Sequence, residues 1–185
     1  MSGLSSCSDT LGMTCRQRVL TPLSAVLAGA AAAAAGTLAM DLLRFVRSTP
    51  RRDLAAFMDW EFSADLRDWE QAPPPAQIGK RIFEGVFQRP LAPEHARVTN
   101  NLVHWLYGMS WGALYGIVAG SIRVAPILSG LVFGPLVWAS GYTVLVPAKL
   151  YRPMWEYDGK TNWEDISGHL AYGVTTAVAF ASLAR

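Results

Sequence analysis

Three ionisable side chains, Asp41, His104 and His169, lie within or at the edge of long apolar stretches of the sequence. Asp41 lies near the end of its stretch and the two histidines lie near the starts of theirs, so alternating membrane passages would bring all three to one depth. Two imidazoles and a carboxylate could relay protons, because histidine titrates near neutral pH. They could instead bind a transition metal such as zinc, with a further ligand from water or from a loop residue such as Glu156 or Asp158.

The competing interpretation gives these side chains a structural role. His104, His169 and Asn101 would then donate hydrogen bonds between helices near the membrane boundary, and Asp41 would pair with a neighbouring arginine. We favour this interpretation, because the sequence has no HxxxH pair and no second acid within an apolar stretch. No metal or cofactor is therefore expected.

Four apolar stretches must position these side chains. The length of each is close to the roughly 20 residues that a helix needs to cross a hydrocarbon core of about 30 Å. Hydrophobic residues make up 51% of the chain and charged residues 16%, well below the roughly 25% of soluble domains. The sequence thus predicts an all-α fold: a polar tail over residues 1–21, then one membrane domain over residues 22–185 that forms a four-transmembrane-helix bundle. The spans are expected at about 22–46, 98–122, 125–148 and 166–183.

Small residues recur at every fourth position of the second stretch and indicate a close-packing helix face. Asn100 and His104 begin this row, and four glycines continue it: Gly108, Gly112, Gly116 and Gly120. A similar row follows His169 and includes Gly173. Both rows predict tight helix contacts, either within one copy of the chain or between copies. The second and third stretches, separated by Arg123 and its immediate neighbours, are expected to form a tight hairpin.

The connection over residues 47–97 carries two short amphipathic patterns, which predict interfacial helices. The first lies between Asp53 and Glu70, and the second follows the break at residues 73–75. In the second pattern, apolar residues lie opposite polar ones: Ile78, Ile82, Phe83, Val86 and Phe87 against Gln77, Lys80 and Arg81. Such a helix either lies at the bilayer surface or caps the bundle.

The connection before the last stretch is rich in aromatic and charged residues, as is typical of the headgroup layer of a bilayer. A headgroup or ligand site is one hypothesis for this segment, with the candidate residues Trp155, Glu156, Asp158 and Trp163. Interfacial aromatic residues also anchor membrane proteins without binding a specific ligand, and we favour this simpler alternative.

Basic residues gather in the two longer connections, which would share one side of the membrane if there are four spans. The positive-inside rule then places these connections in the cytoplasm. Arg16 and Arg18, ahead of the first stretch, favour the opposite orientation. The basic residues form no surface stripe with interleaved aromatics, so no nucleic-acid partner is expected.

A histidine-bearing span with glycine-spaced aromatic residues precedes a Pro-Trp-acid connection and the residues Gly168, His169, Leu170, Tyr172 and Gly173. In these features, residues 100–175 resemble the YagU-like family of small bacterial inner-membrane proteins. The resemblance implies a polytopic protein of a bacterial inner membrane. The function of that family is uncharacterised, so the resemblance assigns no role to His104, His169 or Gly173.

Three functional hypotheses follow, and each has the lipid bilayer as a partner. We favour a non-enzymatic helical bundle that associates with itself or with other membrane proteins, because close-packing faces are abundant and reactive groups are few. A transporter or proton pathway would use Asp41, His104 and His169. A membrane enzyme or lipid-binding protein would act at residues 151–165.

Overall fold

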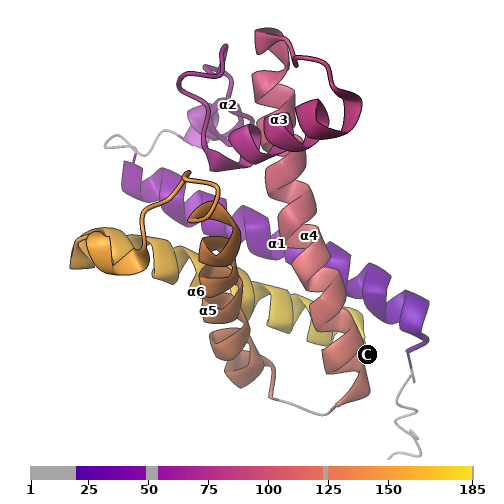
Figure 1. Ribbon diagram of the computed structural model, residues 1–185. Coiled ribbons are helices and arrows are strands. Elements are labelled where there is room, and N and C mark those ends of the chain that lie inside the picture. The colour runs from indigo at the N-terminus through magenta and orange to yellow at the C-terminus, as the bar shows by residue number, and fades with distance from the viewer. Residues whose placement is uncertain (1–19, 49–53, 123–124, 185) are drawn as a thin grey trace, which may run out of the picture.

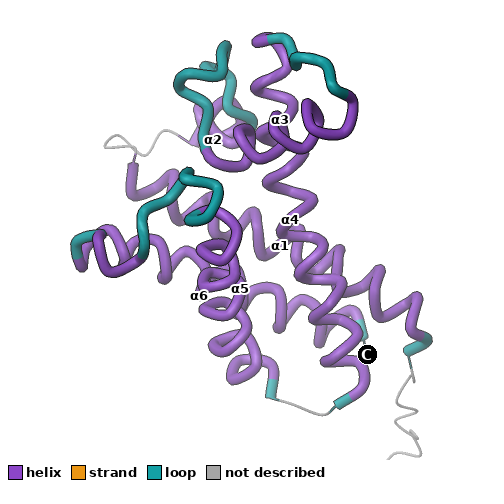
Figure 2. The backbone as a smooth tube through the Cα atoms, in the orientation of Figure 1, coloured by secondary structure: helices purple, strands orange, loops and turns teal. Residues whose placement is uncertain are grey.

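The computed structural model describes residues 20–48, 54–122 and 125–184, and these form six α-helices (Figure 1). Helices, turns and loops account for the described ranges, which contain no strand, so the predicted all-α fold is confirmed (Figure 2). Arg123 and almost all of the predicted polar tail lie outside these ranges. The helices are α1 (Pro22–Ser48), α2 (Phe57–Glu61), α3 (Pro74–Phe87), α4 (Ala96–Ser121), α5 (Pro126–Leu145) and α6 (Gly159–Leu183).

Three of these helices, α1, α5 and α6, are long and apolar enough to cross a membrane. Helix α4 has 26 residues, which reach roughly 39 Å at 1.5 Å per residue. Helix α4 is not one of these candidate spans, and its apolar residues are interrupted by Asn100, His104 and several glycines and aromatic residues. The protein thus has the character of a multi-pass membrane protein with three candidate spans. A fourth passage through α4 stays a prediction.

Helix α1 is central, because it packs against α4 and against α6, and α6 in turn packs against α5. Helices α4 and α5 follow one another in the chain and run in opposite directions, as Figure 1 shows, but their backbones do not pack closely, so the prediction that this hairpin is tight is wrong. Long side chains bridge the gap: the Tyr107 hydroxyl lies 2.9 Å from Ser140 Oγ, and the Tyr115 hydroxyl lies 2.7 Å from Ser129 Oγ. The two helices therefore meet along their lengths through side chains and not through closely packed backbones.

Glycines bring the backbones of α1 and α4 into contact. A Cβ atom on Gly112 would lie 2.5 Å from the carbonyl oxygen of Gly29, and one on Gly116 would lie 3.0 Å from the Cα of Gly29. Gly108 and Gly120 continue the row and face side chains of α1. The small-residue face of α4 is therefore used within one chain.

The contact between α5 and α6 is equally close. A Cβ atom on Gly173 would lie 2.5 Å from the amide nitrogen of Gly134 and would also collide with the carbonyl oxygen of Gly130. The neighbouring Tyr172 is buried, and its hydroxyl donates to the Gly108 carbonyl oxygen at 2.7 Å. Helix α6 is thereby held to α5 through its backbone and to α4 through side chains, including Tyr172 and Phe180, whose ring lies 5.7 Å from that of Tyr115.

The short helix α2 docks on α1 and on the first turns of α4. Phe45 of α1 is 1% exposed, and its ring lies 5.3 Å from that of Phe57 and 5.5 Å from that of Trp60, measured between centroids. The carbonyl oxygen of Phe62, directly after α2, accepts a hydrogen bond from Asn101 Nδ2 at 2.9 Å. This segment of the long connection is therefore fixed to the bundle.

Helix α3 lies along the first part of α4, where Gly79 faces the side chain of Thr99. Farther along α3, the apolar residues Ile82, Val86 and Phe87 are exposed. An exposed apolar face beside the end of a membrane bundle is the arrangement expected of a helix at the bilayer surface. The position of α3 relative to the bilayer stays a prediction.

Candidate functional site

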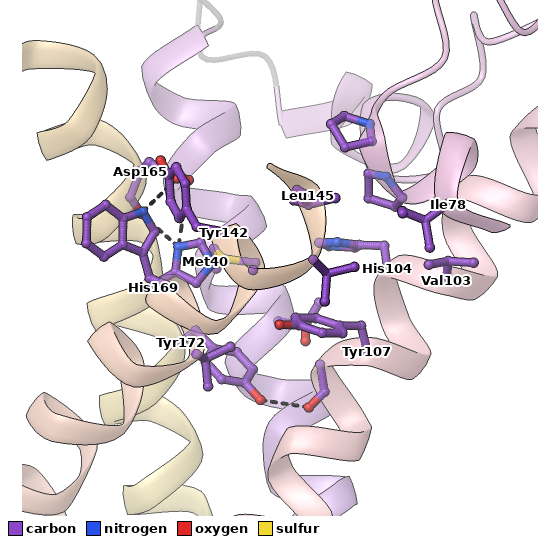
Figure 3. A pocket seen from close by; sticks show the side chains of 18 of the residues that line it. Met40, Ile78, Val103, His104, Tyr107, Tyr142, Leu145, Asp165, His169 and Tyr172 are labelled. Carbon is purple, nitrogen blue, oxygen red and sulfur yellow. Dashed lines mark hydrogen bonds and ion pairs between the residues drawn. The ribbon is translucent and has the colours of Figure 1, made fainter. Parts of the chain in front are cut away.

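A cavity of about 200 Å³ lies between α4 and α5 (Figure 3). Its walls are mainly apolar and aromatic. Helix α4 contributes Val103 and Tyr107, α5 contributes Val137 and Leu145, and α3 contributes Ile78. Concave, mostly apolar sites with a few polar groups are the usual form of a ligand-binding site. The cavity is therefore our candidate site.

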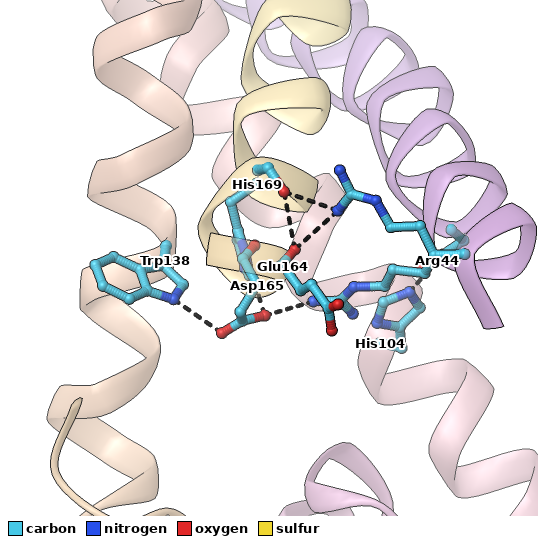
Figure 4. A network of polar contacts seen from close by, with 9 residues as sticks. Arg44, His104, Trp138, Glu164, Asp165 and His169 are labelled. Atoms are coloured by element: carbon cyan, nitrogen blue, oxygen red, sulfur yellow. Dashed lines mark hydrogen bonds and ion pairs between the residues drawn. The ribbon is translucent and has the colours of Figure 1, made fainter. Parts of the chain in front are cut away.

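Asp165 organises the polar wall of this cavity (Figure 4). Its Oδ1 accepts a hydrogen bond from Arg44 Nη2 at 2.7 Å, and its Oδ2 accepts one from the Trp138 indole N–H at 2.8 Å. His169 Nδ1 lies 2.9 Å from the Asp165 carbonyl oxygen, which can only accept, so the imidazole hydrogen is on Nδ1. One carboxylate thus joins side chains from α1 and α5 to α6.

A second cavity, of about 470 Å³, shares Arg44, Tyr142, Tyr151 and Asp165 with the first. Arg47 also lines it and donates to Ser167 Oγ at 2.8 Å. Within the described ranges Arg47 has no carboxylate partner, unlike Arg44. A guanidinium without a carboxylate partner is a natural binding group for phosphate or carboxylate.

Tyr151 adds a hydroxyl donor to both cavities. Burial raises the pKa of Tyr151 above its ordinary value, and the negative charge of Asp165 raises it further. The Tyr151 hydroxyl consequently stays protonated at neutral pH and can donate to an anionic group.

Two of the three ionisable residues identified from the sequence are in contact. His104 Nε2 lies 2.7 Å from Asp41 Oδ2, and the Asp41 side chain is 6% exposed. His169 lines the same cavity as His104 but is hydrogen-bonded to Asp165, so the three do not form one hydrogen-bonded cluster. The expected pairing of Asp41 with an arginine is not found in the described part of the chain. Asp41 pairs with His104, and the neighbouring Arg44 pairs with Asp165.

Sequence reasoning missed Asp165 because the last span was expected to begin at about residue 166. Helix α6 begins at Gly159, and Asp165 lies in its second turn. Its position four residues before His169 places both on one helix face, and this spacing could have identified it.

The connection over residues 151–165 contributes to the second cavity, but not through the residues expected from the sequence. Trp155 and Trp163 are 80% and 62% exposed, and Glu156 is exposed as well. Asp158 is the N-cap of α6, where its carboxylate accepts hydrogen bonds from the backbone N–H and the hydroxyl of Thr161. These bonds lower the pKa of Asp158. The connection instead reaches the cavity through its tyrosines.

Comparisons with protein-family models, with curated proteins and with solved structures gave no match. Among the described residues, no group of three or more His, Cys, Asp and Glu side chains could hold a metal ion. Function is therefore argued from the two cavities, their polar wall and the pair formed by Asp41 and His104.

The substitution Asp165→Asn is expected to destabilise the protein by about 2 kcal/mol, because it removes the charge that holds Arg44 and Trp138. Unfolding by denaturant in detergent micelles would measure this. The control is Glu164→Gln, since that exposed carboxylate has a single ion pair, with Lys160 at 3.8 Å; its effect is expected to stay within about 0.5 kcal/mol. Equal effects of the two substitutions would contradict a structural role for the Asp165 network.

Proposed function

We propose that this protein is a non-enzymatic, multi-pass membrane protein that binds one lipid with an anionic headgroup between α4 and α5. The observation that carries the proposal is the apolar cavity between α4 and α5, two consecutive helices whose backbones do not pack closely. In a bilayer, lipid can enter a space between membrane helices whose backbones do not pack closely. An apolar wall lined by Val103, Val137 and Leu145 suits an acyl chain.

The second cavity supports the choice of an anionic headgroup. It lies beside the ends of α1 and α6, where the headgroup layer is expected, and it contains Arg44 and Arg47. Two carboxylates, Asp165 and Glu164, also line this cavity. Asp165 pairs with Arg44, and Glu164 pairs with Lys160 outside the cavity, so Arg47 is the lining arginine without a carboxylate partner within the described ranges. Each basic residue near a membrane surface contributes about 1 kcal/mol of attraction to anionic lipid.

The packing of the glycines weakens the alternative of a scaffold that assembles through its small-residue faces. Gly112, Gly116 and Gly173 are already in close contact with other helices of the same chain. Those faces are consequently not available to another copy or to another membrane protein. A complex formed through a different surface remains compatible with lipid binding.

The resemblance to the YagU-like family supports a bacterial inner membrane as the location. The gathering of basic residues in the longer connections supports a cytoplasmic position for α2, α3 and the second cavity. Both assignments belong to the proposal. Replacing Cys7 and Cys15 with serine and introducing a single cysteine into α3 allows labelling with a membrane-impermeant reagent in intact cells. Labelling of α3 without permeabilisation would overturn the proposed orientation.

The lipid site can be tested by filling it. A Cβ atom on Gly141 would lie 4.0 Å from its nearest neighbour, Leu145 Cδ1, so a side chain at this position enters the cavity without striking backbone. We expect Gly141→Phe to reduce several-fold the lipid that co-purifies in mild detergent, as measured by mass spectrometry. The matched control is Ala139→Phe, because Ala139 is exposed on the same helix. Equal lipid retention by the two variants would overturn the proposal.

The headgroup preference needs a separate variant. Arg47→Gln is expected to lower the preference for phosphatidylglycerol over phosphatidylcholine about fivefold in a competition between the two lipids, since it removes roughly 1 kcal/mol of attraction. Total lipid bound should change little, because the acyl-chain cavity is intact. An unchanged preference would contradict an anionic headgroup at this position.

A further inference from the structure

Glu61 is a buried acid that the lipid site does not use. It is the last residue of α2 and is 7% exposed. Neither of its carboxylate oxygens makes a hydrogen bond of ordinary geometry within the described ranges. An ionised carboxylate buried without a partner is strongly unfavourable, so its charge must be removed or compensated.

The groups that face Glu61 belong to the two helices on which α2 docks. Asp41 of α1 and His104 and Trp105 of α4 are the side chains that act on its ionisation. Asp41 and His104 are themselves joined at 2.7 Å, and the Trp105 indole nitrogen is buried without a hydrogen-bond partner. The other acid of α2, Asp59, is exposed. Glu61 therefore meets one acid, one imidazole and one neutral donor.

We propose that Asp41, Glu61 and His104 form a proton-binding site that is complete only when α2 is docked. Proton uptake then stabilises the docking of α2, and with it the connection over residues 47–97, on the membrane bundle. The proton binds to Glu61. The neutral acid can then donate a hydrogen bond to Asp41, whose carboxylate is already paired with His104. Without that proton, two carboxylates share one imidazole in a buried space, and their repulsion favours release of α2.

The pH dependence follows from the difference between the docked and released states. Burial, together with the charge of Asp41, raises the pKa of Glu61 from 4.5 to about 7 in the docked state. The docked state therefore binds more protons than the released state between these two values, and docking weakens as pH rises through this range. The docking equilibrium should fall about tenfold from about pH 6 to about pH 8, because the docked carboxyl loses its proton there.

Hydrogen–deuterium exchange of the full chain in phosphatidylcholine nanodiscs tests the proposal. After correction for the intrinsic exchange rate, protection of residues 57–62 should be about tenfold higher at about pH 6 than at about pH 8. Glu61→Gln mimics the protonated acid and should keep this segment protected at both pH values. The matched control, Asp59→Asn, removes an exposed acid of the same helix and should retain the pH dependence of the unmodified chain.

Two results would overturn the proposal: protection of α2 that is independent of pH in the unmodified chain, or pH dependence that survives in Glu61→Gln. A second measurement does not rely on the variant being folded. In the unmodified protein with ¹³C-labelled glutamate side chains, one of the six glutamates should titrate near neutral pH. If all of them titrate in the ordinary acidic range, the proton site does not exist. Neither measurement depends on lipid binding between α4 and α5.

Discussion

Replacing Gly173 with valine is expected to separate α5 from α6 and to destroy the cavity between α4 and α5. The new side chain would begin within 2.5 Å of the Gly134 amide nitrogen and 2.7 Å of the Gly134 Cα, and it would overlap the Gly130 carbonyl oxygen. All three obstacles are backbone atoms, which cannot turn away as a flexible side chain can. We expect a loss of about 3 kcal/mol or more.

The effect is large because α5 has few other attachments. Its extended helix contact is with α6, and it meets α4 mainly through tyrosine side chains. A shift of α5 would carry Val137 and Leu145 away from the cavity. Denaturant unfolding in detergent micelles would measure the stability. The amount of lipid that co-purifies would show whether the cavity is intact.

Gly141→Val is the control for this prediction. Gly141 lies on α5, and a Cβ there has open space around it, so the same change of residue should have little effect on stability. Gly173→Val with the stability and lipid retention of the unmodified chain would contradict the close backbone contact between α5 and α6.

Hydropathy and helical periodicity predict the main helices, because a long apolar segment has few alternatives to a membrane or core helix. The glycine spacing predicts close packing but not the partner, since the same row serves contacts within a chain or between chains. Gly29 and Gly134, the partners of the two rows, can be assigned only when the backbones are placed. For the same reason, the absence of close backbone packing between α4 and α5 could not be predicted from the short link between them.

The polar residues of the candidate site could be predicted from the sequence only in part. Asp41 and His104 could be selected because a polar group within an apolar stretch is conspicuous. Asp165 was placed outside the last span because charged residues lower the hydropathy of the first turns of α6. Glu61 belongs to an acidic segment whose solvent-exposed and buried members look alike in sequence. Its burial depends on how α2 docks, which is a long-range contact.

Phe45→Ala is expected to release α2 from the bundle and to cost about 3 kcal/mol or more, as is usual for removal of a buried aromatic ring. Phe45 is 1% exposed and contacts both aromatic rings of α2, Phe57 and Trp60. Loss of this anchor leaves the polar contacts with α4, which include the hydrogen bonds that Arg97 and Asn101 donate to the Phe62 carbonyl oxygen and the bond that Asn100 donates to Ser63 Oγ. Hydrogen–deuterium exchange should then show residues 57–62 unprotected at all pH values.

The release should be local, because the contact between α5 and α6 does not involve Phe45. Peptides from α5 and α6 should therefore keep the protection that they have in the unmodified chain. Leu42→Ala is the control, since Leu42 lies on the same helix and is 41% exposed; it should leave α2 protected.

If α2 stays protected in Phe45→Ala, its docking depends on the polar contacts with α4 and not on the aromatic anchor. If α2 is released, Glu61 becomes exposed to solvent, and its neutral-pH titration should disappear together with the protection, because burial is the main cause of its raised pKa.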